Sequence, residues 1–190
     1  MESLAMSAIV AETVGSVTAE EFWRLSQSEE FRGELIAGEV RELTPPGFEH
    51  SCIFGNVYEM LLAFVKARKL GKVLGECGFL ISRDPDTVLA PDVAFISAER
   101  MPATITRKFC EVVPDLAVEV VSPGDAYSEV RDKAERYLAG GVKEVWIADP
   151  RRGVVEVVRP PDKWIVLRGD DLIETPLLPG FSAPARSVFV

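Results

Sequence analysis

DLAVEVVS, residues 115–122, is the stretch that decides the fold of this 190-residue chain. Side chains alternate between the two faces of an extended strand, and both faces of this segment are largely apolar. That pattern predicts a strand at the centre of a sheet. Glu119 is the exception, because an ionised carboxylate among aliphatic side chains costs several kcal/mol unless it is paired or bound to a cation. The segment therefore predicts a central strand whose carboxylate needs a positive partner.

A second apolar segment, APDVAFIS at residues 90–97, raises the same question with Asp92. If the two segments are adjacent strands, Asp92 and Glu119 lie close together. Proteins typically hold Mg²⁺ with one or two carboxylates plus waters and substrate phosphates, so the pair predicts a divalent-cation site. Two plainer interpretations stay open. Asp92 is also typical of a strand end hydrogen-bonded to backbone, and Glu119 of a structural ion pair with Lys133 or an arginine.

The segment that follows, SEVRDKAERYLAGG, predicts a helix that Ser128 caps and Gly140-Gly141 ends. At 100° per residue, Lys133 falls inside the apolar stripe, which is formed by Val130, Ala134, Tyr137 and Leu138. A lysine on that face points toward the sheet and can reach the site of Glu119, where an ammonium would stabilise charge on a phosphate. The alternative is a surface pair with Glu129, four residues earlier.

The rest of the chain supplies the remaining elements of one α/β (α+β) domain with a mixed central sheet flanked by helices. Thr18 and Glu21 form a capping-box pattern for a short helix at 19–25. A hairpin turns at Ala37-Gly38, and apolar spacing predicts the longest helix over 49–69. A second hairpin joins 72–83 to 87–97, and a β-meander closes the fold. We expect a single domain over 1–190, with 1–17 flexible or loosely packed.

Composition narrows the class of protein. Hydrophobic residues make up 47% and charged residues 27%, which is ordinary for a soluble domain. The net charge of −9 means that a nucleic-acid partner would need a local basic patch. Neither a signal peptide nor a membrane-spanning run is expected. The three widely spaced cysteines, Cys52, Cys77 and Cys110, are interpreted as reduced core thiols of a cytoplasmic protein.

The ordered set of segments carries a resemblance. PD at 91–92 and E119-V-V, within the order helix, three strands, helix, strand, resemble the PD-(D/E)XK restriction-endonuclease-like superfamily. More narrowly, the chain is similar to the Uma-two family of bacterial endonucleases over about 32–158. The segments that carry this likeness are GELIAGEV, PPGFEHSCIFGNVYEML, APDVAFIS, PDLAVEVVSP and KAERYLAGGVKEVWIADP.

The resemblance implies an endonuclease that depends on Mg²⁺ or Mn²⁺ and acts on nucleic acid, with DNA favoured. Asp92 and Glu119 would be the metal ligands, completed by the carbonyl of Val120. A regular motif of this superfamily would carry lysine where this chain has Val121. The family resemblance implies that Lys133 supplies it from the following helix. If that replacement is unproductive, the chain is a catalytically inactive binding or regulatory protein with a nuclease fold.

Two further residues match the family pattern, Glu34 in GELIAGEV and His50 in PPGFEH. His50, the only histidine, is a candidate general base, and a helix-terminal histidine without such a role is the alternative. Glu34 is a second candidate catalytic residue. The alternative is that it pairs with a residue across its hairpin.

Three surfaces are candidates for contact with partners. Basic side chains are found at the end of the long helix (Lys66, Arg68, Lys69, Lys72) and in the loop after the Asp92 strand (Arg100, Arg107, Lys108). The loop is the better candidate for contact with phosphates, because it leaves the sheet near the predicted site. Apolar strands at the C-terminus, ending SVFV, offer a surface for a homodimer.

Overall fold

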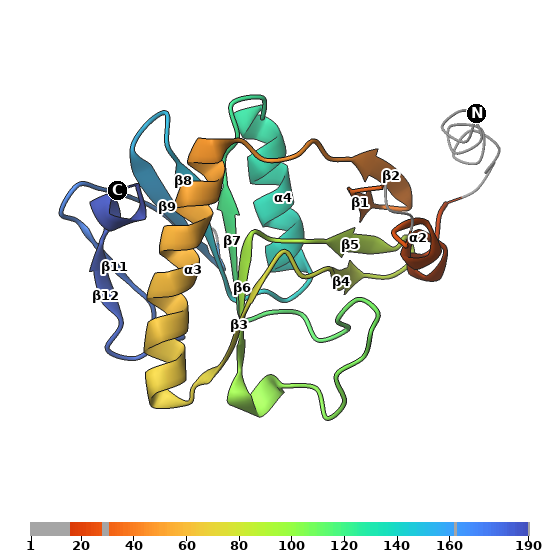
Figure 1. The fold of residues 1–190 in the computed structure, drawn as a ribbon, viewed down its shortest axis with the longest axis horizontal. Helices are drawn as coiled ribbons and strands as arrows, with labels where there is room; N and C mark the ends of the chain where they lie inside the picture. Colours follow the sequence, from red (N-terminus) through yellow and green to blue (C-terminus); the bar gives the residue numbers. More distant parts are fainter. Residues whose placement is uncertain (1–15, 28–30, 162, 190) are drawn as a thin grey trace.

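The computed structural model describes residues 16–27, 31–161 and 163–189, and its core is a six-stranded mixed sheet (Figure 1). The strand order is β10-β9-β8-β7-β6-β3. The bounds are β3 Gly71–Gly75, β6 Val93–Ser97, β7 Leu116–Val120, β8 Glu144–Asp149, β9 Val154–Arg159 and β10 Lys163–Arg168. Beside it stands a four-stranded sheet of order β2-β1-β5-β4, with β1 Gly33–Ile36, β2 Glu39–Glu42, β4 Phe79–Ser82 and β5 Thr87–Leu89.

Strand β7 is buried along its whole length, as its two apolar faces predict. It pairs antiparallel with β6 and parallel with β8, and α4 (Tyr127–Ala139) connects β7 to β8. The long helix α3 (Phe48–Arg68) packs on one face of the sheet, whereas α4 packs on the other. Ala117 and Val121 belong to the core under α4, and Val118 and Val120 to the core under α3. Glu119 therefore lies on the α4 side of the sheet.

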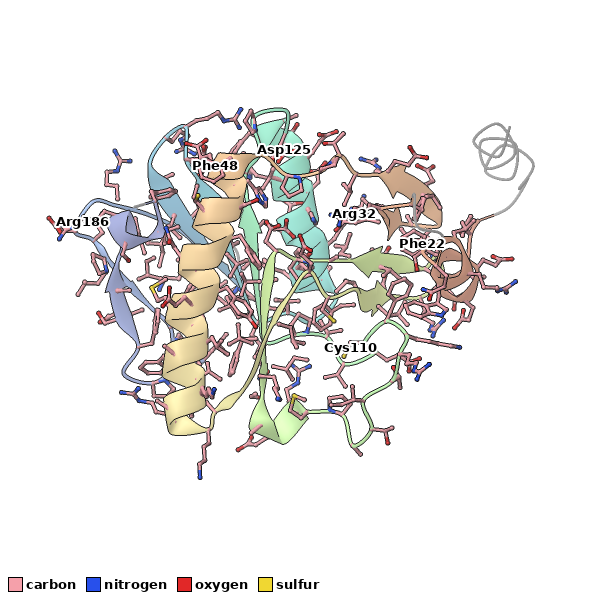
Figure 2. The ribbon with its side chains drawn as sticks, in the orientation of Figure 1. Phe22, Arg32, Phe48, Cys110, Asp125 and Arg186 are labelled. Carbon is pink, nitrogen blue, oxygen red and sulfur yellow. The ribbon has the colours of Figure 1, made fainter. Side chains whose placement is uncertain are left out.

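The N-terminal part follows its local signals closely. Helix α2 (Ala19–Leu25) carries the complete capping box of Thr18 and Glu21. The β1–β2 hairpin turns at Ala37 and Gly38, both of which have positive φ. The predicted loosely packed segment lies mostly outside the described residues, although the Val17 N–H donates to the Gly38 carbonyl. Figure 2 shows Phe22 of α2 at one end of the molecule, beside the four-stranded sheet, and Arg186 at the other end.

The second predicted hairpin is divided between the two sheets. β4 and β5 form a hairpin in the four-stranded sheet, as expected. Their outer halves, β3 and β6, instead pair with each other in the six-stranded sheet. The C-terminal meander is correct for β9 and β10, but β11 (Leu172–Glu174) pairs with β12 (Ser182–Pro184) in a sheet of their own. Both differences arise because the apolar pattern of a strand does not specify which sheet the strand joins.

Several smaller predictions were wrong. Helix α4 begins after Ala126, not Ser128, and no side chain caps it. The C-terminal SVF is not a strand, because Ala185–Val188 form a 3₁₀ helix with Val188 buried in the core. The three cysteines are free, but Cys52 is exposed and Cys77 and Cys110 are half-buried, so none is a fully buried core thiol. No helix in the described part of the chain is long and apolar enough to span a membrane.

Candidate active site

The strand pairing brings Asp92 and Glu119 together. In the β6–β7 register Val93 faces Val118 and Ala94 faces Ala117. Continuing this register by one residue places Asp92 opposite Glu119, and directly opposite residues share a face of the sheet. The contact at this end is direct, because the Val120 N–H donates to Asp92 Oδ2 at 2.6 Å. Asp92 is thus both a backbone-bonded strand-end residue and a member of the carboxylate pair.

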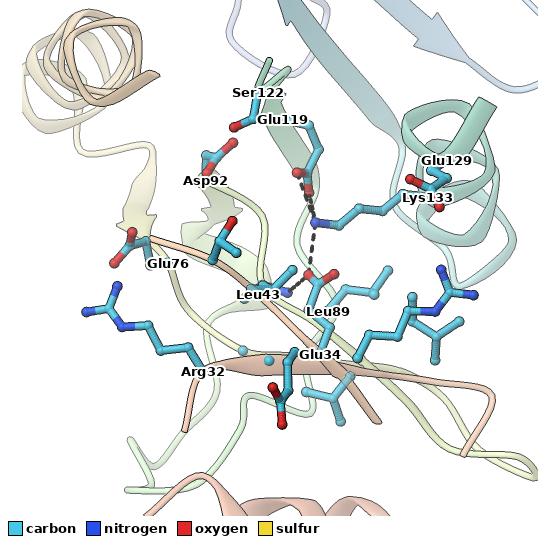
Figure 3. Close-up of a pocket in the computed structure, with 18 of the residues that line it drawn as sticks. Arg32, Glu34, Leu43, Glu76, Leu89, Asp92, Glu119, Ser122, Glu129 and Lys133 are labelled. Carbon is cyan, nitrogen blue, oxygen red and sulfur yellow. Dashed lines mark hydrogen bonds and ion pairs between the residues drawn. The ribbon is translucent and has the colours of Figure 1, made fainter. Parts of the chain in front are cut away.

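Lys133 reaches this site from α4, as its place in the apolar stripe predicts. Its Nζ lies 2.9 Å from Glu119 Oε1 and 3.0 Å from Glu119 Oε2. The same nitrogen lies 2.9 Å from Glu34 Oε1, so the ammonium sits between two carboxylates (Figure 3). The alternative pair with Glu129 is wrong. The lysine side chain is 20% exposed and lines the pocket described below.

Glu34 belongs to the small sheet but serves the same site. Its side chain is buried, and Oε1 also accepts a hydrogen bond of 2.9 Å from the Ala90 N–H, just ahead of Asp92. It faces Arg41 across the hairpin, as the cross-hairpin alternative supposed, but its ion pair is with Lys133. Glu34 therefore ties the hairpin to α4 and to the strand that carries Asp92.

His50 enters from the first turn of α3 and is buried. Its Nε2 lies 3.3 Å from Asp92 Oδ1, and this hydrogen bond raises the pKa of the imidazole above its ordinary value. Its Nδ1 is buried and has no hydrogen-bond partner among the described residues. Because the imidazole donates to Asp92, the geometry favours a residue that holds this carboxylate. The general-base role stays a prediction.

Tyr137 is a member of the site that the sequence prediction did not include. Its hydroxyl donates to Glu119 Oε1 at 2.7 Å, and the ring is fully buried. Helical periodicity places Tyr137 in the apolar stripe of α4, one turn after Lys133. That i, i+4 spacing puts both side chains on one face of the helix, and it is the signal that could have identified the hydroxyl as a second partner of Glu119.

Burial dominates the electrostatics of the site. It raises the pKa of Glu119 to about 8; the ammonium of Lys133 opposes this rise, and the negative charges of Asp92 and Glu34 add to it. Burial by itself would lower the pKa of Lys133, but the carboxylates of Glu119 and Glu34 outweigh it and raise that pKa. The lysine is therefore charged at neutral pH. Among the described residues, its ammonium is the one lysine charge beside a cluster of three acidic side chains that line the same pocket.

All five predicted site residues line one pocket of about 710 Å³, together with Val120. Its lining arginines are not among the basic residues predicted to contact phosphates. Neither the helix-end lysines and arginine nor the loop residues Arg107 and Lys108 line it, and Arg100 pairs with Asp115 at 2.9 Å. Three other arginines do line the pocket, namely Arg32, Arg41 and Arg136.

The donor chemistry of the pocket suits a hard divalent cation. The described residues contain no group of three or more His, Cys, Asp or Glu side chains arranged to hold a metal. Mg²⁺ does not require such a group, because one or two carboxylates with waters and substrate phosphates are sufficient. Asp92 and Glu119 supply that number from opposed positions on adjacent strands. Binding of a cation by the pair, completed by the carbonyl of Val120, stays a prediction.

Comparison with known proteins gives a family and a fold. A family model for Uma2, described as "Putative restriction endonuclease", matches residues 19–186. The structure is also similar to the crystal structure of "a putative nuclease belonging to DUF820" from Anabaena variabilis, with a TM-score of 0.78. The two sequences are 23% identical, and the match covers 91% of this chain and 97% of that one. The search of curated proteins gives no match.

Proposed function

Because this chain belongs to the Uma2 family, we propose that it is an endonuclease that uses Mg²⁺ or Mn²⁺ to hydrolyse phosphodiester bonds of nucleic acid, with DNA as the favoured substrate. The observation that supports this most is the convergence of Asp92, Glu119 and Lys133, from two strands and a helix, in one pocket. The cytoplasm is the location that we assign with this function.

Each residue has a role in the proposal. Asp92 and Glu119 hold the divalent cation, which when bound polarises the phosphate and lowers the pKa of a bound water. Lys133 stabilises the negative charge that builds on the phosphate. Glu34 orients that ammonium by accepting a bond of 2.9 Å from it. His50 fixes the rotamer of Asp92 through the bond to Oδ1. These roles account for why five polar groups lie within the pocket.

The position of Val121 bears on the alternative of an inactive nuclease fold. This residue, which replaces the lysine of a regular motif, is 1% exposed and packs in the core under α4. A lysine at that position would be buried, whereas Lys133 places an ammonium at the same carboxylate from the helix. The replacement thus keeps the charge where the chemistry needs it, which favours the active enzyme.

Dependence on a divalent cation tests the proposed function. Purified protein is expected to cleave DNA with Mg²⁺ or Mn²⁺ and to stop when EDTA removes the metal, because the carboxylates alone repel a phosphodiester. Calorimetric titration with Mg²⁺ is expected to give binding for the wild type and none for Glu119→Ala. Metal-independent binding of a partner with no turnover of DNA or RNA would instead support the inactive alternative.

Replacing Tyr137 by phenylalanine is expected to lower both stability and activity. The variant deprives a buried carboxylate of a donor, so the free energy of unfolding should fall by about 1.5–3 kcal/mol. Cleavage should slow roughly tenfold, because Glu119 loses one of the bonds that set its orientation. Chemical denaturation and single-turnover cleavage measure the two effects.

The chain contains a matched control for this variant. Tyr127 donates to Glu156, another buried strand carboxylate, at 2.7 and 2.9 Å, and Arg152 also contacts Glu156. Glu156 does not line the pocket. Tyr127→Phe is therefore expected to leave cleavage unchanged. Equal cleavage rates in the two phenylalanine variants would show that Tyr137 has no role in the active site.

A further inference from the structure

Three arginines that have no ion-pair partner among the described residues line the pocket. Six arginines of the described chain form ion pairs, namely Arg83, Arg100, Arg151, Arg152, Arg159 and Arg186. Arg32, Arg41 and Arg136 form neither an ion pair nor an aromatic contact within the described residues, and all three are exposed. In an acidic chain with many carboxylates available, unpaired arginines gathered at one pocket indicate an anionic ligand.

The β1–β2 hairpin places Arg32 and Arg41 on the face that lines the pocket. Arg41 lies directly opposite Glu34 in the β1–β2 register, and directly opposite residues share a face of the sheet. Arg32 precedes Glu34 by two residues and shares that face as well. Because Glu34 points to Lys133, both guanidinium groups belong to the wall that faces the pocket. Figure 3 shows Arg32 on the side of the pocket away from Lys133.

Helix α4 contributes the third arginine from the opposite wall. Arg136 is three residues after Lys133, so the two side chains are neighbours on the helix surface. The ion pair of Glu34 with Lys133 bridges hairpin and helix, and the three arginines line the same pocket. Acidic side chains outnumber basic ones in the lining. Among the described residues that line the pocket, these arginines, Lys133 and His50 supply the positive charge.

The size of the pocket constrains the substrate. Glu34 and Glu119 are 4% and 7% exposed, so a phosphate must enter the pocket to meet them. A volume of about 710 Å³ is that of a pocket for a small molecule, comparable to roughly one or two nucleotides. B-DNA, whose major groove alone is about 12 Å wide, is too large to enter it intact. A single strand is flexible enough to bend a phosphate into such a pocket, and proteins that bind single strands use a positively charged groove that tracks the backbone.

We infer that the substrate enters as single-stranded DNA, between the β1–β2 hairpin and α4, and that Arg32, Arg41 and Arg136 bind its backbone phosphates. This inference rests on the proposed function, because it places the strand at the same carboxylates. Phosphate contacts on either side of the reacting bond fix the register of the strand without reading its sequence. The enzyme is therefore selective for unpaired DNA and tolerant of sequence.

Fluorescence anisotropy tests the inference without requiring turnover. The probes are a labelled 20-nucleotide single strand and its blunt-ended duplex. Each probe is titrated with the full-length protein in a buffer that contains Ca²⁺ in place of Mg²⁺. The wild type is expected to bind the single strand at least tenfold more tightly than the duplex. Arg32→Ala, Arg41→Ala and Arg136→Ala should each weaken this binding about three- to tenfold and reduce the slope of log K against log salt by about 0.7.

Arg168→Ala is the matched control, because Arg168 is an exposed arginine at the end of the edge strand β10 and forms no ion pair with any residue that the structure describes. It is expected to change neither affinity nor slope. Equal affinity for the duplex, or an equal loss in Arg168→Ala, would overturn the inference. Duplex cleavage with Mg²⁺ that is as fast as single-strand cleavage would overturn it while the proposed function stands. Single-strand binding in the expected pattern without any cleavage would support the inference and reject the proposed function.

Discussion

Glu119→Gln is expected to reduce Mg²⁺-dependent cleavage by three orders of magnitude or more while the protein stays folded. The substitution keeps the shape of the side chain and its acceptor for Tyr137, and it removes the negative charge that the proposed cation requires. A loss of about 10³-fold corresponds to about 4 kcal/mol of transition-state stabilisation, which is in the range for removal of a metal-binding or charge-stabilising group. Initial rates on labelled DNA at saturating Mg²⁺ measure the effect.

Glu156→Gln is the control that separates the site from a buried carboxylate in general. Glu156 is 2% exposed on β9, accepts from the Tyr127 hydroxyl and pairs with Arg152 at 2.5 Å. It thus reproduces the surroundings of Glu119 with a tyrosine and a cation, outside the pocket. We expect Glu156→Gln to lower stability and to leave the rate per folded molecule unchanged. The assignment of Glu119 fails if the two glutamine variants lose activity to the same extent.

The sequence predicted those parts of the fold and the site that depend on local pattern. The two apolar faces of 115–122 predicted a central strand, and β7 is fully buried. Helical periodicity put Lys133 on the face of α4 that meets the sheet, where its nitrogen contacts Glu119. In both cases the side chain direction follows from the period of a single element, so no knowledge of distant pairing is required.

What the sequence did not predict depends on how distant elements dock. Arg32 and Arg41 line the pocket because the hairpin packs against α4 through Glu34, a contact between residues that are far apart in the chain. The loop after β6 looked closer to Asp92, but Arg100 of that loop pairs with Asp115 instead. Likewise, the division of 72–97 between two sheets cannot be read from apolar runs, because burial on both faces is the same in either sheet.

Lys133→Met is expected to destabilise the protein by about 3–5 kcal/mol at pH 9, because it leaves the buried carboxylates of Glu34 and Glu119 without their cation. The deficit should shrink at lower pH. Burial raises the pKa of Glu119 to about 8, above the ordinary value of 4.5, and the lysine opposes this rise, so the folded-state pKa is higher still without the lysine. Between pH 4.5 and about 8 the two proteins therefore lose the same stability from this group. Above pH 8 only the variant goes on losing it, until the pH passes its higher folded-state pKa.

Urea denaturation between pH 5 and 9 measures this dependence, and Lys143→Met is its control. Lys143 lies 2.7 Å from the buried carboxylate of Asp115, but Asp115 keeps Arg100 and the Ser97 N–H when Lys143 is removed. The control variant should therefore lose much less stability.

The effect of Mg²⁺ on thermal stability distinguishes a metal site from a purely structural ion network. In Lys133→Met, a cation bound at Asp92 and Glu119 replaces the missing charge, so Mg²⁺ should raise the Tm of this variant more than that of the wild type. If Mg²⁺ leaves the Tm of both proteins unchanged, the carboxylates and Lys133 form a structural network, and the proposed metal site is wrong.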